Sequence, residues 1–169
     1  MTNSTNIDLR YTEDTEIRLT MKLLIATDGT KYGEAAVEAV CKYSLGPDDT
    51  IHLISIIDMA VPLGLDVYSG SLPNMADYES AARSHAEAVI EQARSKIIEQ
   101  HGDVKITTDI LFGSPDSRIV ETAEEQMTDL IVLGSHGYNR WERLLLGSVS
   151  DSVVHHAHCS VLIARTNEK

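Results

Sequence analysis

The stretch Lys22–Tyr43, KLLIATDGTKYGEAAVEAVCKY, decides the fold. Its first residues, KLLIAT, form an apolar run typical of a strand that is buried on both faces of a sheet. A polar turn containing Asp28 follows, and then KYGEAAVEAVCKY, a helical pattern that ends before Gly46 and Pro47. A buried strand that passes directly into a helix is the repeating unit of parallel α/β sheets.

The same unit recurs along the rest of the chain. Four more apolar runs follow the first: Thr50–Ile57, Val104–Leu111, Leu130–Ser135 and Ser160–Arg165. Between them we predict a long helix near Met75–Gln100 that stops at Gly102, a helix with Ser114 as N-cap and Pro115 in its first turn, and a short helix within Gly147–His158. The long helix has an apolar stripe at helical spacing, made of Tyr78, Ala82, Ala86, Val89, Ala93 and Ile97. Strict alternation predicts a doubly wound α/β fold, with a five-stranded parallel sheet between two layers of helices.

The third apolar run indicates the strand order. In it Val104, Ile106, Thr108 and Ile110 alternate with Lys105, Thr107, Asp109 and Leu111, as in a partly exposed edge strand. The order 3-2-1-4-5 puts this strand at one edge and satisfies the right-handed crossover rule. The fifth run lies at the other edge, where an apolar strand left open is a pairing hazard. We therefore predict a homodimer that pairs through the fifth strand, at Val161, Leu162, Ile163 and Ala164.

Length and charge bound the classes of function. The chain has 169 residues and a net charge of −12, which favours a single domain and disfavours a nucleic-acid partner. No window approaches the roughly 20 apolar residues of a membrane span, so no membrane partner is expected. Residues 1–20 are polar and lack the apolar core of a secretion signal, which predicts a cytoplasmic protein. We expect a flexible tail over 1–20, one domain over 21–166 and a short tail over 167–169.

The predicted strand order puts three glycines near the same end of the sheet. Strands one and four are neighbours where the winding of the sheet reverses, and ligands bind at the carboxyl ends of strands at that point. Asp28 follows strand one, and Gly134 and Gly137 follow strand four. Gly147 and Ser148 then open a helix, whose free N–H groups and dipole favour an anion. We expect a phosphate chain to be held here; the alternative is that the glycines only shape turns and a helix start.

The cysteines and histidines are weaker evidence for a functional site. Cys41 and Cys159 have neither metal-ligand nor disulfide spacing, so we interpret them as reduced, partly buried thiols. The histidines near the end of the chain, His155, His156 and His158, are interpreted as the polar end of a helix rather than a metal site. His136 could act as a general base, but no nucleophile accompanies it, and shaping the glycine loop is the favoured role. No P-loop motif and no dinucleotide-binding glycine motif are present.

The spacing G-x2-G-x9-G-S over Gly134, Gly137, Gly147 and Ser148 resembles the nucleotide signature of the universal stress protein family, in its ATP-binding branch. KLLIATDGT is similar to the first strand and acidic loop of that family, and IHLISIID is similar to its second strand. DLIVLGSHGYNRWERLLLGSVSDSVVHHAHCSVLIAR resembles its C-terminal third. The likeness covers about 145 residues, a single-domain length.

The resemblance implies a three-layer sandwich of the adenine nucleotide alpha hydrolase-like or flavodoxin-like kind. It implies that Ala26, Thr27 and Asp28 line the adenosine, with Asp28 accepting from a ribose hydroxyl, and that Ile56 lies against adenine. The residues implied for the ribose and phosphates are Gly134, Ser135, His136, Gly137, Gly147, Ser148, Val149 and Ser150. The ligand would be ATP or another adenine nucleotide, with Mg²⁺ on the phosphate oxygens. The family also commonly dimerises through its last strand.

Two departures from the family pattern stand out. Ser160 occupies a position that is usually proline, and Arg140 and Arg143 add positive charge to the loop after Gly137. Arg140 is therefore a further candidate for the phosphates, the alternative being a solvated loop charge. We therefore predict an ATP-binding stress or signalling protein that is not an enzyme beyond slow ATP hydrolysis at most, and that acts through nucleotide-dependent conformation or through binding of an unknown protein partner. The alternatives are a slow ATP hydrolase or nucleotidyl-transfer enzyme, and a nucleotide-free dimeric interaction module.

Overall fold

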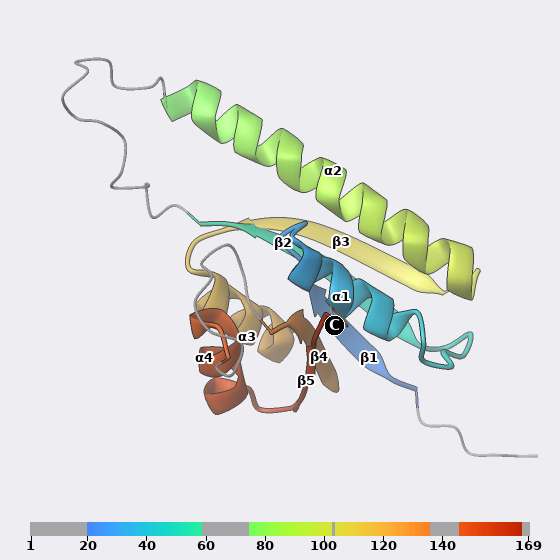
Figure 1. Cartoon of the computed structure of the whole chain (residues 1–169). Coiled ribbons are helices and arrows are strands. Elements are labelled where there is room, and N and C mark those ends of the chain that lie inside the picture. The colour runs from blue at the N-terminus through green and yellow to red at the C-terminus, as the bar shows by residue number, and fades with distance from the viewer. Residues whose placement is uncertain (1–19, 59–74, 103, 136–145, 167–169) are drawn as a thin grey trace, which may run out of the picture.

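The computed structural model describes residues 20–58, 75–102, 104–135 and 146–166 of the chain. Strands and helices alternate, and all strand pairs are parallel (Figure 1). The elements are β1 (Lys22–Ala26), α1 (Lys31–Val40), β2 (Thr50–Ile57), α2 (Met75–His101), β3 (Lys105–Phe112), α3 (Pro115–Glu125), β4 (Leu130–Gly134), α4 (Ser148–His156) and β5 (Ser160–Ala164). The strand order is β3-β2-β1-β4-β5, so the predicted doubly wound sheet and its order are confirmed.

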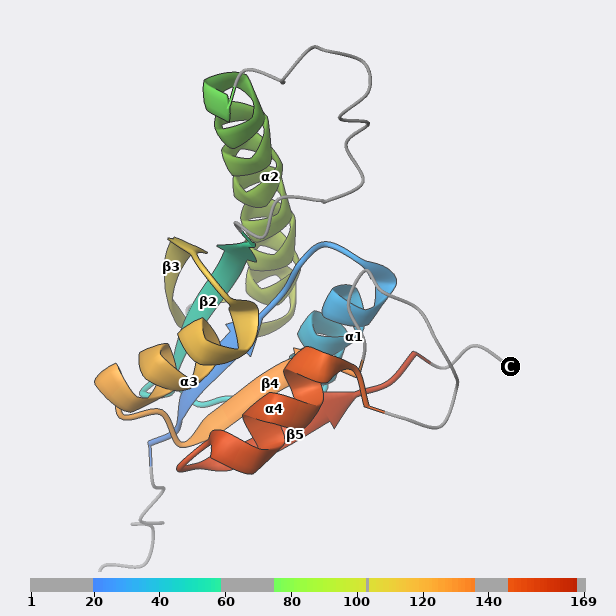
Figure 2. The same ribbon diagram turned by 90° about the vertical axis from the view of Figure 1, so that its left-hand side faces the viewer.

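The sheet separates two apolar layers. Along β1, Leu23 and Ile25 pack beneath α1 and α2, whereas Leu24 and Ala26 pack against α3 and α4. Figure 2 shows the two pairs of helices on opposite faces of the sheet. Both faces of the central strands are therefore buried, which explains why their sequences are continuously apolar instead of alternating.

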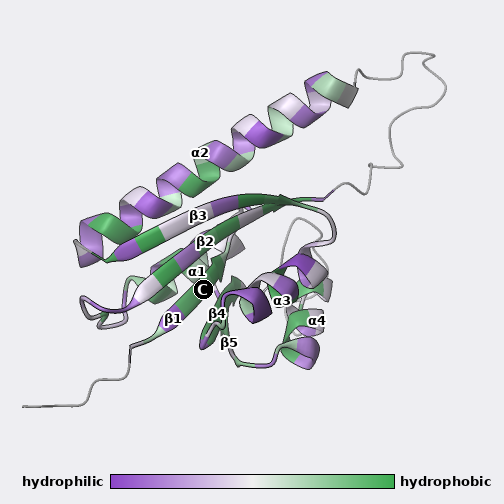
Figure 3. Ribbon diagram, turned by 180° about the vertical axis from the view of Figure 1, so that it is seen from behind, coloured by the Kyte–Doolittle hydropathy of each residue, from purple (hydrophilic) through white to green (hydrophobic). Residues whose placement is uncertain are grey.

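The two edge strands differ, as the sequence predicted. β3 exposes Lys105, Thr107, Thr108 and Asp109, and Figure 3 shows both polar and apolar positions along the strand, with apolar ones at its carboxyl end. In β5 the first residue is exposed, the next three are half-buried and Ala164 is buried. Its outer edge has no strand partner among the residues that the structure describes. An open apolar edge of this kind is a surface on which a further strand can pair.

Two helix details depart from the predictions. α1 ends at Val40 and does not continue to Tyr43, because the hydrogen bonds change there to shorter turns, Lys42 N–H to the Ala39 carbonyl (3.1 Å) and Tyr43 N–H to the Val40 carbonyl (3.0 Å). The ring of His101 also reaches the Val40 carbonyl, at 3.1 Å. In α2 the apolar stripe is buried only from Ala86 onward, because the N-terminal half of the helix projects beyond the sheet (Figure 1).

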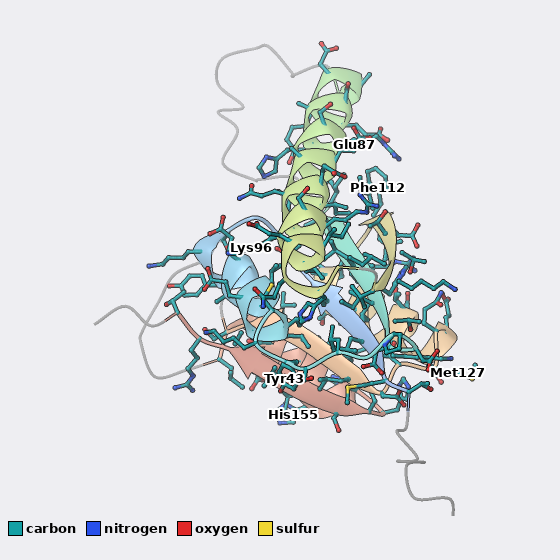
Figure 4. The ribbon with its side chains drawn as sticks, turned by 90° about the vertical axis from the view of Figure 1, so that its right-hand side faces the viewer. Tyr43, Glu87, Lys96, Phe112, Met127 and His155 are labelled. Carbon is teal, nitrogen blue, oxygen red and sulfur yellow. The ribbon has the colours of Figure 1, made fainter. Side chains whose placement is uncertain are left out.

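The two ends of the sheet are easy to distinguish in Figure 4. Phe112, the last residue of β3, lies beside the N-terminal half of α2, where Arg83 stands over its ring at 5.4 Å. Met127, just before β4, lies at the opposite end. The first of these ends carries the carboxyl termini of the strands, where ligands bind in folds of this class.

Candidate functional site

The strand register brings the loops after β1 and β4 together. Ala26 pairs with Leu133 as the last registered pair, so Thr27 and Asp28 continue beside Gly134 and Ser135. The Thr27 amide also donates to the Ile54 carbonyl at 3.0 Å, which holds the loop against β2. The structure thus places the predicted acid of β1 and the predicted glycine of β4 at the same rim of the sheet.

The Asp28 carboxylate is held by the residue that begins the next helix. Its Oδ1 accepts from the Thr30 amide at 3.0 Å and from the Thr30 hydroxyl at 2.7 Å. The Thr30 hydroxyl also accepts from the Gly33 amide, at 3.4 Å, and so caps α1. Asp28 is half-buried and stands before the N-terminus of α1, where the helix dipole favours negative charge.

Sequence reasoning missed two glycines next to Asp28, Gly29 in the loop and Gly33 in the first turn of α1. A Cβ on Gly33 would lie 2.6 Å from Asp28 Oδ1 and 2.7 Å from the Thr27 hydroxyl. Gly29 has φ +73°, and a Cβ there would lie 2.5 Å from Val89 of α2. The sequence TDGTKYG shows turn residues before a helix, but only the packed structure shows that both positions lack room for a side chain.

Gly134 has a packing role that the sequence did not reveal. A Cβ at this position would lie 2.4 Å from the carbonyl oxygen and 2.5 Å from the carbonyl carbon of Tyr32. Because these atoms belong to the backbone of α1, no rotamer change can make room for a side chain. Whatever ligand binds nearby, glycine is required here so that α1 can approach the end of β4.

The start of α4 is attached to the end of β4. The Gly147 amide donates to the Ser135 carbonyl at 2.8 Å. The Ser150 hydroxyl lies 3.0 Å from the same carbonyl and 2.9 Å from the Gly147 carbonyl, and Ser150 is only 2% exposed. Ser150 was predicted to hold phosphates, but its side chain is turned inward to these carbonyls. It can therefore serve a ligand only through its backbone N–H or by fixing the helix end.

The N-terminus of α4 has the properties of an anion site. Gly147 is the N-cap and has no side chain, and no side chain caps this end among the described residues. The first-turn amides of Ser148, Val149 and Ser150 have no partner within the helix, as at any helix start. Ser148 is exposed and Val149 is half-buried, packing on the α3–α4 side of the core. The N–H groups and the dipole together favour a bound anion.

A hydrogen-bonded carboxylate fixes α4 against α3. Asp116 Oδ2 accepts from the Ser152 hydroxyl of α4 at 2.8 Å, and Oδ1 accepts from the Ser114 hydroxyl at 2.5 Å. The bonds from Ser114 and Ser152 lower the pKa of Asp116, because they favour its charged form. The bond from Ser152 therefore helps to hold α4 in place against the start of α3.

Of the other residues predicted to contact the nucleotide, two are described by the structure and three are not. Ala26 and Ile56 lie toward the carboxyl ends of their strands, on the α3–α4 side of the sheet, and Ile56 is half-buried at the packing edge of that layer. His136, Gly137 and Arg140 lie outside the described residues.

The cysteines and the C-terminal histidines lie apart from the rim residues described above. Both cysteines are free thiols of intermediate exposure, as predicted, and burial raises the pKa of each. Nδ1 of His155 lies 2.8 Å from the Asp151 carbonyl, and Nδ1 of His156 lies 2.7 Å from the Ser152 carbonyl, which places both rings along the last turn of α4. Within the described part of the chain, no three metal-ligating side chains converge.

Two hollows border the first two helices. An open one of about 640 Å³ lies at the C-terminal ends of α1 and α2 and has no residue in common with the predicted site. A smaller one of about 70 Å³ lies behind the Asp28 loop, lined in part by Thr27, Glu34, Gln92 and Lys96. Its size and polar lining suit ordered water. No helix in the described ranges is both long enough and apolar enough to span a bilayer.

Comparison with known proteins identifies relatives over nearly the whole chain. The model of the Universal stress protein family matches residues 20–165. Universal stress protein MJ0531 of Methanocaldococcus jannaschii is 32% identical over 148 residues, which span 88% of this chain and 84% of that protein.

Solved structures agree in fold. Hypothetical protein MJ0577 superposes with a TM-score of 0.73 at 23% identity, covering 90% of this chain and all of that one. A universal stress protein in complex with cAMP has a TM-score of 0.58 at 21% identity, with coverages of 88% and 98%. The Arabidopsis thaliana family protein At3g01520, solved with AMP bound, has a TM-score of 0.63 at 19% identity, with coverages of 87% and 92%.

Proposed function

Because the chain belongs to the universal stress protein family, we propose that it binds an adenine nucleotide, ATP in particular, at the rim between β1 and β4. The bound and free states would present different surfaces to a protein partner, so that the nucleotide acts as a signal and not as a substrate. The proposal assigns this role to the domain over residues 21–166.

One observation carries the proposal. A half-buried carboxylate after β1 and an uncapped helix start after β4 occupy neighbouring positions at the point where the winding of the sheet reverses. The carboxylate suits a ribose hydroxyl, and the helix start suits phosphates. Two structures from the family contain adenine nucleotides, AMP and cAMP, which supports the chemical class of ligand.

In the proposed complex, residues of β1 and β2 hold the adenosine and residues after β4 hold the phosphates. Asp28 accepts from a ribose hydroxyl, and Ile56 with Ala26 offers apolar surface to the base. The amides of Ser148, Val149 and Ser150 and the Ser148 hydroxyl bind phosphate oxygens, joined by Ser135, His136, Gly137 and Arg140. Mg²⁺ would be held mainly through the phosphates, as it usually is in nucleotide sites.

The function is tested by identifying the ligand and then measuring turnover. We expect denaturation of the purified protein to release an adenine nucleotide, which mass spectrometry identifies. Calorimetry should then show that ATP binds to protein from which the nucleotide has been removed. Failure to bind ATP, ADP, AMP or cAMP at millimolar concentration would contradict the proposal and favour the nucleotide-free interaction module. The enzyme alternative differs in rate: hydrolysis or nucleotidyl transfer faster than about one turnover per second, an ordinary enzymatic scale, would favour it.

We further propose that β5 pairs with its copy in a second chain. The half-buried Val161, Leu162 and Ile163 form an apolar edge that a second strand would cover. Light scattering at micromolar concentration is expected to give twice the chain mass of 18.6 kDa. The variant Ile163→Lys should shift the mass to that of a monomer, because it places a charge on the half-buried apolar surface along β5 that a second strand would cover, and circular dichroism should show that the fold survives. A monomeric wild-type protein would show that the edge stays open.

A further inference from the structure

Thr30 makes two hydrogen bonds to the Asp28 carboxylate. Both its amide and its hydroxyl donate to the same oxygen, Oδ1, at 3.0 and 2.7 Å. Two donors on one oxygen hold the position of Oδ1 and so restrict the directions that the other oxygen, Oδ2, can take. The bond from the hydroxyl is charge-assisted and correspondingly strong.

The Thr30 hydroxyl is itself held in place by α1. It accepts from the Gly33 amide at 3.4 Å as the N-cap of the helix, which directs its single proton to Asp28. The absence of a side chain at Gly33 leaves the space that Oδ1 occupies, since a Cβ there would be 2.6 Å away. The helix start, the hydroxyl and the carboxylate therefore form one connected unit.

We propose that Thr30 is a positioning residue, which sets the ribose specificity of the site by orienting Asp28 toward one ribose hydroxyl. This inference rests on the proposed nucleotide function and extends it from a ligand class to a specificity. A mobile carboxylate would lose more conformational freedom when it binds a hydroxyl, and would therefore discriminate less between ribose and deoxyribose.

A purely structural role for Thr30 predicts something different. If Thr30 only caps α1, its loss weakens the helix and lowers the affinity for every nucleotide alike. A positioning role instead lowers the affinity for the ribonucleotide alone. The ratio of affinities for ATP and its deoxy analogues therefore separates the two roles, whereas protein stability does not.

The experiment measures the dissociation constants of ATP, 2′-deoxy-ATP and 3′-deoxy-ATP by calorimetry on the full chain. For the wild type we expect about tenfold weaker binding of the analogue that lacks the bound hydroxyl, the usual effect of one hydrogen bond to a charged group. Thr30→Val keeps the shape and removes the hydroxyl, and should reduce the ratio to about threefold or less. Thr30→Ser keeps the hydroxyl and should restore the wild-type ratio.

Two further variants make the outcome decisive. Ala39→Gly weakens α1 without touching Asp28, and should leave the ratio unchanged. Asp28→Ala should abolish the discrimination, and Thr30→Val added to it should have no further effect on the ratio.

If Asp28→Ala abolishes the discrimination and Thr30→Val preserves it, the positioning role is refuted and nucleotide binding stands. If the wild type binds ATP and its deoxy analogues equally well, or if Asp28→Ala still discriminates between them, the assignment of Asp28 to a ribose hydroxyl fails, and the inference about Thr30 fails with it. If no nucleotide binds at all, the proposed function itself fails.

Discussion

Replacing Gly134 by alanine is expected to lower the free energy of unfolding by about 3 kcal/mol, at the upper end of the usual cost of overpacking. The added methyl group would lie 2.4 Å from the Tyr32 carbonyl oxygen, and backbone must move to admit it. A loss of this size is a large part of the roughly 5–15 kcal/mol that stabilises a typical domain. Urea denaturation of the two proteins measures the difference.

The matched control is Gly102→Ala. Gly102 has φ +60°, but a Cβ there meets nothing within 4 Å, so alanine brings backbone strain without a clash. Its expected cost is about 1 kcal/mol. A second control is Tyr32→Ala, which should not rescue Gly134→Ala, because the closest atoms are backbone atoms and remain. Equal losses at positions 134 and 102 would show that the close approach of α1 to β4 does not constrain the protein.

Gly134 also shows where sequence reasoning reached its limit. Periodicity and apolar runs identified every strand of the sheet and its order, because burial on one face or two leaves a direct pattern in the residues. The reason for a single glycine lies in a contact between residues 102 positions apart, and no local pattern records it. The glycine was therefore assigned to the ligand, although the neighbouring helix already requires it.

The same limit applies to the hydroxyl groups of the site. The family resemblance implied that both Ser148 and Ser150 hold phosphates, together with Gly147 and Val149. Two residues along a helix differ by about 200° in direction, so the two side chains cannot point to the same side. The structure exposes Ser148 and buries Ser150. In contrast, the location of Asp28 was predictable, since it follows directly from the strand order.

Gly147 is expected to behave in the opposite way to Gly134. Its backbone, φ −64° and ψ 156°, is one that any residue adopts, so neither strain nor a left-handed conformation explains the glycine. We expect Gly147→Val to weaken ATP binding at least about 100-fold, by placing a branched side chain where phosphates would approach the helix start in the proposed complex. The fold should survive, with a stability loss of about 1 kcal/mol from the poorer N-cap. Calorimetry and urea denaturation measure the two effects, and unchanged affinity would refute the phosphate site.

Gly147→Ser separates this site from a merely structural helix start. Serine is a good N-cap, so its hydroxyl would accept from a first-turn amide and raise the stability by a few tenths of a kcal/mol, up to about 0.5. The same bond would occupy an amide that we propose binds a phosphate oxygen, and we expect ATP to bind about tenfold more weakly. Val154→Ala, at an exposed position further along α4, should change neither quantity appreciably. A helix start with only a structural role predicts the stability gain without the loss of affinity. Opposite changes in the two quantities would show that this end of α4 is left uncapped because a ligand supplies the cap.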